Sequence, residues 1–283
     1  MTSTAYTEVA VPMGDDGSFQ LGILAKPHIP AQTGVVIVVG GPQYRAGSHR
    51  QFVLLSRALA QAGFAVLRID YRGMGDSDGK PYEFTNVSPD IARAIDAFEA
   101  QVPTLRRIVL WGLCDGASAA LLYMHDTRDA RVTGLCLLNP WVRSEASLAR
   151  TQVKHYYTQR LRQREFWVKL ASGKVAASAV AGLIKSVRSM RVTRKPQAVA
   201  NLPFQDKMRL AWGDFRGSLL LVLSGDDYTA KEFLEFAGAD REWGAALQQP
   251  NVCRHEVKDA DHTFSDLKHS RDVEMATIRW LEK

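Results

Sequence analysis

Cys114 lies at the centre of the segment Gly112-Leu113-Cys114-Asp115-Gly116, between an apolar run typical of a buried strand and an apolar helical pattern. Glycines on both sides of a residue allow the tight strand-to-helix turn that lifts a side chain clear of a sheet. A thiol at the start of a helix and beside a histidine is favoured as the thiolate, which is the nucleophilic form. The segment therefore predicts that Cys114 is a catalytic nucleophile rather than a buried structural cysteine.

His262 is the histidine best placed to activate this thiol. It stands in Asp261-His262-Thr263-Phe264, a few residues after the last strand expected in the chain. A loop at that position reaches across the carboxyl edge of a parallel sheet toward a nucleophile at the end of a central strand. We therefore predict that His262, which alone among the seven histidines has this placement, exchanges a proton with Cys114.

A carboxylate is expected between these two residues in the chain, because an acid orients the imidazole and stabilises its cation. The apolar run 218–223 is typical of a buried strand, and Ser224-Gly225-Asp226-Asp227 follows it. We favour Asp227 for this role and keep Asp226 as the alternative. The competing interpretation is that one of the two caps the helix expected over 229–236.

An acyl-transfer site also needs N–H donors for the oxygen that becomes negative. One donor is expected to be the backbone amide of Asp115, directly after the nucleophile. The other is expected from the loop Gly40-Gly41-Pro42-Gln43, which follows the first long buried strand. Because proline has no N–H, this second donor is Gly41 or Gln43, and we favour Gly41.

The elements that must position these residues alternate between strands and helices. After an N-terminal hairpin over 7–24, strands are expected at 35–39, 64–70, 107–111, 132–138, 218–223 and 252–257, and helices at 52–62, 89–100, 117–124 and 271–281. This alternation predicts a mostly parallel twisted sheet flanked by helices. Residues 141–213 show only helical periodicity, so we expect an inserted helical cap there and a core formed by residues 1–140 and 214–283.

Composition restricts the class of protein. The 283 residues are 46% hydrophobic and 23% charged, which is ordinary for a globular chain. Residues 1–16 show no signal pattern and no run of eighteen apolar residues lacks a charge, so we expect a soluble protein without a transmembrane segment. The spacing of Cys114, Cys136 and Cys253 suits neither a metal site nor a disulfide framework, and this favours the cytoplasm.

The net charge of +6 is concentrated in one segment. Residues 143–216 hold sixteen Lys and Arg against four Asp and Glu, a formal charge of +12, and the rest of the chain carries −6. A basic cap would attract anionic substrates such as coenzyme A or acyl-carrier thioesters, whereas the alternative is a solvated helical face. No motif that reads duplex nucleic acid accompanies the charge, so nucleic acid is not an expected partner.

A further motif, D-x-R-G-x-G-x-S over Asp70 to Ser77, completes a pattern that resembles the α/β-hydrolase superfamily over nearly the whole chain. More narrowly, the runs 40–45 and 48–52, the Gly-Leu-Cys-Asp-Gly segment and the run 224–230 resemble the exosortase A system-associated hydrolases of type 1. The resemblance implies an α/β-hydrolase fold and hydrolase chemistry without a cofactor, in bacteria that make exopolysaccharide. We expect the loop over 70–79 to be structural.

The leading hypothesis is that the protein cleaves an ester or thioester in a small acyl substrate through an acyl-enzyme on Cys114. A Cys–His–Asp triad with cysteine in place of serine resembles the triads of dienelactone hydrolase and of polyester synthases. An acyltransferase that passes the acyl group to a carrier, an amine or a glycan is therefore the alternative. A second alternative is a non-catalytic binding protein, which the presence of Cys114, His262 and Asp227 disfavours.

Overall fold

A computed structural model describes residues 5–14, 19–41, 43–143 and 202–283. By its internal contacts the chain divides into two compact units, one formed by residues 1–142 with 203–283 and the other by residues 143–202. Every described helix and strand belongs to the first unit. Within the described ranges, no helix combines the length and the apolar character needed to cross a bilayer.

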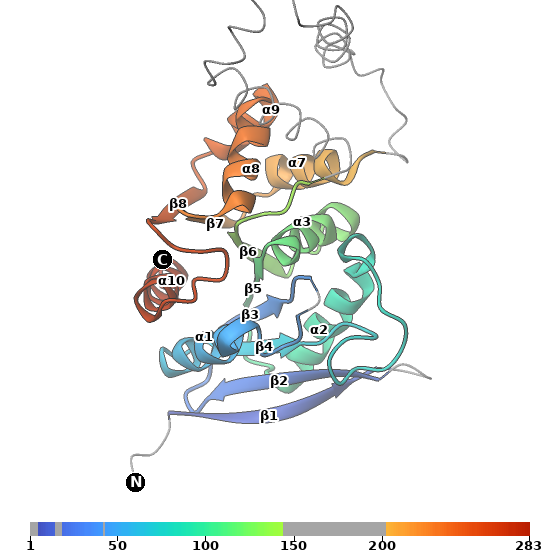
Figure 1. The fold of residues 1–283 in the computed structure, drawn as a ribbon. Helices are drawn as coiled ribbons and strands as arrows, with labels where there is room; N and C mark the ends of the chain where they lie inside the picture. The colour runs from blue at the N-terminus through green and yellow to red at the C-terminus, as the bar shows by residue number, and fades with distance from the viewer. Residues whose placement is uncertain (1–4, 15–18, 42, 144–201) are drawn as a thin grey trace, which may run out of the picture. The chain divides into compact units, whose positions relative to one another are not determined.

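An eight-stranded sheet forms the centre of the first unit (Figure 1). The strands are β1 (Tyr6–Met13), β2 (Gln20–Pro27), β3 (Thr33–Val38), β4 (Ala65–Ile69), β5 (Arg107–Leu113), β6 (Val132–Leu138), β7 (Ser218–Ser224) and β8 (Val252–Val257). They lie in the order β1-β2-β4-β3-β5-β6-β7-β8. The hairpin β1-β2 and the pair β2-β4 are antiparallel, and all other pairs are parallel. The predicted mostly parallel sheet is confirmed.

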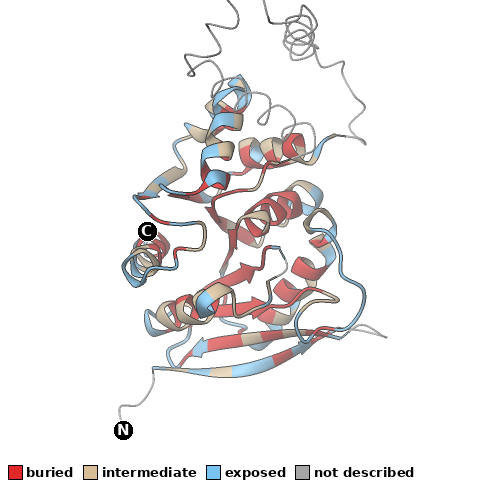
Figure 2. Ribbon diagram, in the orientation of Figure 1, coloured by how far each residue is buried: buried red, intermediate tan, exposed pale blue. Residues whose placement is uncertain are grey.

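Burial explains why the central strands have apolar sequences without alternation. All residues of β3 and β4 are buried, as are nearly all of β5, β6 and β7, because helices cover both faces of the sheet (Figure 2). The edge strands β1 and β8 contain several exposed residues. Nonlocal pairing therefore places the apolar carboxyl ends of β3, β5, β6 and β7 side by side.

Helices cover both faces of the sheet. They are α1 (Gln51–Gln61), α2 (Ser88–Gln101), α3 (Asp115–Thr127), α7 (Phe204–Asp214), α8 (Tyr228–Gly238), α9 (Arg241–Leu247) and α10 (Leu267–Leu281), with short 3-10 turns η1 (Ser48–Arg50) and η2 (Phe84–Asn86). Figure 1 shows α1 and α10 on one face and α2 and α3 on the other. Each helix expected from the sequence overlaps one of these.

Helix α7 falls in the range 141–213 that the sequence analysis assigned to a cap, yet it belongs to the core unit. Trp212 is fully buried, with ring centroids 6.2 Å from Phe233 of α8 and 5.7 Å from Trp243 of α9. Its indole N–H donates to the Ala246 carbonyl at 3.1 Å. This apolar packing means that the core resumes at Pro203 rather than at residue 214. Residues 144–201 of the expected cap lie outside the described residues.

The loop after β4 is built around the buried carboxylate of Asp70. This carboxylate accepts hydrogen bonds from the backbone N–H groups of Arg45 at 2.6 Å and Asp76 at 3.1 Å, and it pairs with the Arg45 side chain. Gly75 has φ 57, and a Cβ there would collide with Asp70. These contacts agree with the structural role expected for this loop.

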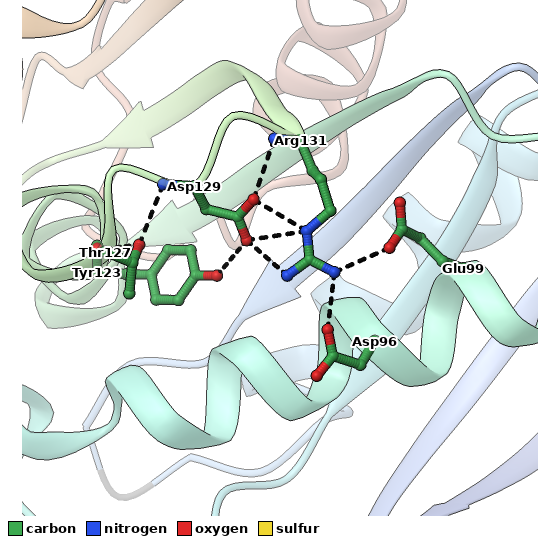
Figure 3. Close-up of polar contacts among 6 residues, drawn as sticks. All are labelled: Asp96, Glu99, Tyr123, Thr127, Asp129 and Arg131. Carbon is green, nitrogen blue, oxygen red and sulfur yellow. Dashed lines mark hydrogen bonds and ion pairs between the residues drawn. The ribbon is translucent and has the colours of Figure 1, made fainter.

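A polar network joins α2, α3 and the residues just before β6 (Figure 3). Arg131 donates to Asp96 at 2.7 Å, to Glu99 at 2.8 Å and through two further nitrogens to Asp129, which also accepts from Tyr123 at 2.5 Å. Burial alone raises the pKa of Asp129, but the hydrogen bonds from Arg131 and Tyr123 outweigh it and lower the pKa. The network fixes the amino end of β6, at the edge of the sheet opposite the carboxyl ends.

Candidate active site

Cys114 forms the turn between β5 and α3 with φ 60 and ψ −125, a conformation that is costly for any residue except glycine. The glycines two residues on either side make this turn possible. A Cβ at Gly112 would lie 2.5 Å from the Gly116 carbonyl, and a Cβ at Gly116 would collide with the carbonyl oxygen of Val38. The Cys114 N–H donates to the Leu138 carbonyl at 2.8 Å. The side chain is only half-buried, so a substrate can reach it.

Asp227 holds the imidazole of His262. Its Oδ2 lies 2.9 Å from His262 Nδ1, and its side chain is 7% exposed. The same carboxylate accepts hydrogen bonds from the backbone N–H groups of Thr229 at 3.1 Å and Ala230 at 3.0 Å, so it also caps α8. The role of acid and the role of helix cap, which the sequence analysis treated as alternatives, therefore fall on one side chain.

Asp226 is placed differently. Its side chain is 82% exposed and lies 3.3 Å from Lys231 Nζ, and its backbone N–H donates to the Ala260 carbonyl at 2.9 Å. The structure thus brings Asp227, and not Asp226, to the imidazole.

The His262 side chain also lies within hydrogen-bonding reach of the Cys114 thiol. Its contacts with Asp227 and then with Cys114 raise the pKa of His262 to about 10, although burial works in the opposite direction. An imidazole with this pKa is protonated at neutral pH, so His262 can donate a proton. The arrangement can therefore present a sulfur nucleophile together with a proton donor.

Two buried polar residues that the sequence analysis did not single out hold the loop that carries His262. The Asn139 amide N–H₂ donates to Ser224 Oγ at 2.8 Å and to the His262 carbonyl at 3.3 Å. The Ser224 backbone N–H donates to Asn139 Oδ1 at 2.9 Å, and its hydroxyl donates to the Asp261 carbonyl at 2.9 Å. The available signal was a polar residue at the carboxyl end of each of two neighbouring apolar strands.

The expected oxyanion donors lie close to Cys114. The N–H groups of Gly41, Asp115 and Gly116 face the Asp115 carboxylate and act to lower its pKa, but burial is the larger effect and raises it. Gly41 has φ 59, and a Cβ there would lie 3.8 Å and 3.9 Å from the two carboxylate oxygens. The structure therefore brings together the backbones of Gly41 and Asp115 and, with them, the Asp115 side chain.

The Gln43 side-chain amide donates to Ser48 Oγ at 3.0 Å, a contact that does not use its backbone N–H, so Gln43 stays the alternative second donor. Pro42 lies outside the described residues.

The other two cysteines differ from Cys114. Cys136 is fully buried in β6, where burial raises the pKa of its thiol, and Cys253 is half-buried in the edge strand β8.

Comparison with known proteins gives the family. The model of the "Alpha/beta hydrolase family" matches residues 35–276. A solved esterase of Pyrococcus furiosus is 16% identical with a TM-score of 0.64 over 99% of this chain and 93% of its own. A dienelactone hydrolase of Anabaena variabilis is 15% identical with a TM-score of 0.60 over 98% of both chains. At such low identity these likenesses show the fold.

A third similarity is local. The human Protein ABHD12B is 49% identical over 49 residues, which cover 17% of this chain and 13% of the human protein. The family match, in contrast, extends from β3 to α10 and includes the segments that carry Cys114, Asp227 and His262. The chain therefore belongs to the alpha/beta hydrolase family and is an enzyme of the hydrolase type.

Proposed function

We propose that the protein is a cysteine hydrolase that cleaves an ester or thioester bond through an acyl-enzyme on Cys114. One observation carries the proposal: the half-buried thiol at the strained turn lies within reach of His262, whose Nδ1 is 2.9 Å from the Asp227 carboxylate. This is the nucleophile, base and acid arrangement that acyl transfer requires. Because the chain is an enzyme of this family, the non-catalytic alternative is not retained.

In the proposed reaction the Cys114 thiolate attacks the substrate carbonyl carbon, and the π electron pair moves onto the carbonyl oxygen. The backbone N–H groups of Gly41 and Asp115 stabilise this oxyanion. When the tetrahedral intermediate collapses, the bond to the leaving group breaks and the leaving group takes a proton from His262. The neutral imidazole then removes a proton from water, which attacks the thioester, releases the acid and restores the thiolate and the imidazolium.

Acyl transfer is the second candidate, and the sulfur nucleophile favours it. A thioester intermediate is open to thiols and amines as well as to water, so a suitable acceptor can divert the acyl group. A product assay with added amine, thiol and sugar acceptors separates the two candidates. If the acyl group always passes to water, the protein is a hydrolase and transfer is ruled out.

We infer that the natural substrate is anionic and belongs to exopolysaccharide or envelope metabolism. Two features support this inference: the motif resemblance to the exosortase A system-associated hydrolases, and the formal charge of +12 on residues 143–216. In this proposal the basic segment 143–216 attracts a coenzyme A or acyl-carrier thioester. The cytoplasm is the proposed location, because a thiol nucleophile must remain reduced.

The test of the proposed function is covalent labelling followed by turnover. Incubation with p-nitrophenyl butyrate should add one butyryl group to Cys114, located by mass spectrometry, and release p-nitrophenol. Cys114→Ala should lose the adduct and about a thousandfold or more of kcat/KM. Cys253→Ala, which removes another half-buried thiol, is the matched control and should retain both. An adduct on another residue, or turnover in Cys114→Ala at the wild-type rate, would contradict the proposal.

A further inference from the structure

The side chain of Asp115 lies against the loop of Gly40 and Gly41, which is expected to supply an oxyanion donor. A Cβ at Gly40 would collide with Asp115 Oδ1, and a Cβ at Gly41 would lie 3.8 Å from Oδ2, so the carboxylate stands directly against this loop. The N–H groups of Gly41, Asp115 and Gly116 all face it. These include the two N–H groups that the proposed mechanism assigns to the substrate oxygen.

The immediate surroundings of this carboxylate are poor in compensating charge. Asp115 Oδ1 is buried and has no hydrogen-bond partner among the described residues. Within the site, the cation of His262 attracts this carboxylate. The attraction of the His262 cation favours the ionised form of Asp115, but burial of the carboxylate outweighs it and raises its pKa.

The loop after β4 adds Tyr71 to these surroundings. Its hydroxyl is buried and has no hydrogen-bond partner within the described part of the chain, and burial raises its pKa. It faces the side chains of Asp115 and Asp90. Asp90 of α2 is itself paired with Arg72 at 2.6 Å. Tyr71 cannot supply a positive charge to Asp115, and the nearby cation of Arg72 is paired with Asp90 instead.

We propose that Asp115 is a catalytic carboxylic acid whose neutral form donates a hydrogen bond to the substrate carbonyl oxygen. This inference rests on the proposed function of Cys114. An ionised carboxylate at this position would repel the negative charge that develops on the oxygen, because two negative oxygens cannot share one site. A neutral carboxyl group instead supplies a further donor, as a carboxylic acid held neutral in an apolar oxyanion site does.

The proton balance of the reaction is unchanged by this role. The Asp115 proton is shared in a hydrogen bond while the sulfur–carbon bond forms, and it stays on the carboxyl group when the intermediate collapses. The leaving group still takes its proton from His262. Turnover should therefore depend on the protonation of Asp115 without consuming its proton.

The experiment measures kcat/KM for p-nitrophenyl butyrate as a function of pH in the wild type and in Asp115→Asn. Above the ionisation of Asp115 the wild-type value should fall by about tenfold for each pH unit, because the active form carries one more proton. Asp115→Asn keeps a neutral donor and should lose this fall. Asp126→Asn, an exposed aspartate at the other end of α3, is the matched control and should follow the wild type.

Two more variants test whether a neutral donor at position 115 is what the reaction needs. Asp115→Leu has no donor and should be about a hundredfold less active than the wild type at a pH where Asp115 is protonated. Asp115→Ser supplies a smaller neutral donor and should also abolish the fall, which matters if the asparagine variant does not fold. Parallel pH profiles in the wild type and in the folded neutral variants would overturn the inference. If the butyryl adduct still forms on Cys114, the proposed function survives that result; if no adduct forms, the proposed function itself fails.

Discussion

Asp227 combines two tasks that are usually given to different side chains. Its carboxylate accepts N–H groups from the first turn of α8 and, at the same oxygen that binds Ala230, the Nδ1 of His262. Burial raises its pKa, but the His262 contact and the two amides outweigh this effect and lower it, so the acid stays ionised. The helix therefore fixes the carboxylate, and the carboxylate fixes the imidazole.

The double role allows catalysis to be separated from stability. Asp227→Asn keeps the capping ability, because asparagine is as good an N-cap as aspartate. It removes the negative charge that holds His262, so kcat should fall by about a hundredfold to ten-thousandfold, and the fall in melting temperature should come from the lost His262 pair and not from the cap. Asp226→Asn, one residue earlier and 82% exposed, should leave kcat unchanged. An equal fall in kcat in the two variants would contradict the assignment of Asp227 as the acid.

The raised pKa of His262 predicts a pH-dependent contribution to stability. Its folded value of about 10 lies above its ordinary value of 6.5. The stabilisation is therefore fully present below pH 6.5 and is lost as the pH rises through the folded pKa. The melting-temperature gap between the wild type and His262→Gln, followed by calorimetry, should be constant in mild acid and should narrow steadily into alkali. A gap independent of pH would contradict the imidazolium pair.

At the scale of residues, the sequence supports Cys114 and His262 because their types and flanking motifs are local signals. The sequence favoured Asp227 over Asp226 but kept both, since the choice depends on which side chain turns back toward the first turn of α8. The position of the Asp115 carboxylate was equally inaccessible. It results from the close approach of the loop after β3 to the start of α3, which no local pattern encodes.

At the scale of elements, the apolar runs of the central strands were predictable because burial on both faces removes polar residues. The order β2-β4-β3-β5 was not, since it is set by pairing between distant segments. Helix α7 was placed in a cap because it adjoins a basic stretch, and α9 was not predicted because it has seven residues. The tryptophans of these helices, Trp212 and Trp243, are buried because they pack against each other and against Phe233.

The network at the amino end of β6 should stabilise the junction of α2 and α3 (Figure 3). Arg131→Met keeps most of the side-chain volume but leaves the largely buried Asp129 carboxylate without its cation, which should cost about 1–3 kcal/mol in the free energy of unfolding. Arg128→Met removes an arginine that is 84% exposed and 3.9 Å from Asp214, and should cost less than about 0.5 kcal/mol. Urea titration measures both.

Stability measured in acid tests whether the Arg131–Asp129 contribution comes from charge. The pKa of Asp129 is lowered in the folded protein, so its contribution is present above the ordinary carboxyl pKa and is lost as the pH falls through the folded value. The stability difference between the wild type and Arg131→Met should therefore shrink in acid. A difference that stays constant there would show that packing, and not charge, is responsible.

For the whole molecule, the uneven charge predicts how substrates arrive. Residues 143–216 carry +12 and the rest of the chain −6, so a proposed anionic thioester should be attracted to one part of the surface. Raising the salt concentration from low to physiological should lower kcat/KM for a butyryl coenzyme A thioester by about tenfold, because ions screen the attraction. An uncharged butyryl thioester should be nearly unaffected. The same salt dependence for both would exclude attraction by the basic segment.

The edge position of β8 has a consequence for inactivation by heat. Among the described strands β8 pairs only with β7, and two of its six residues are exposed, yet the loop that carries His262 follows directly from it. Outer strands detach in partial openings that leave the central strands intact. Warming should therefore uncouple the imidazole from the sulfur while most of the protein is still folded, so turnover should fade reversibly before circular dichroism changes.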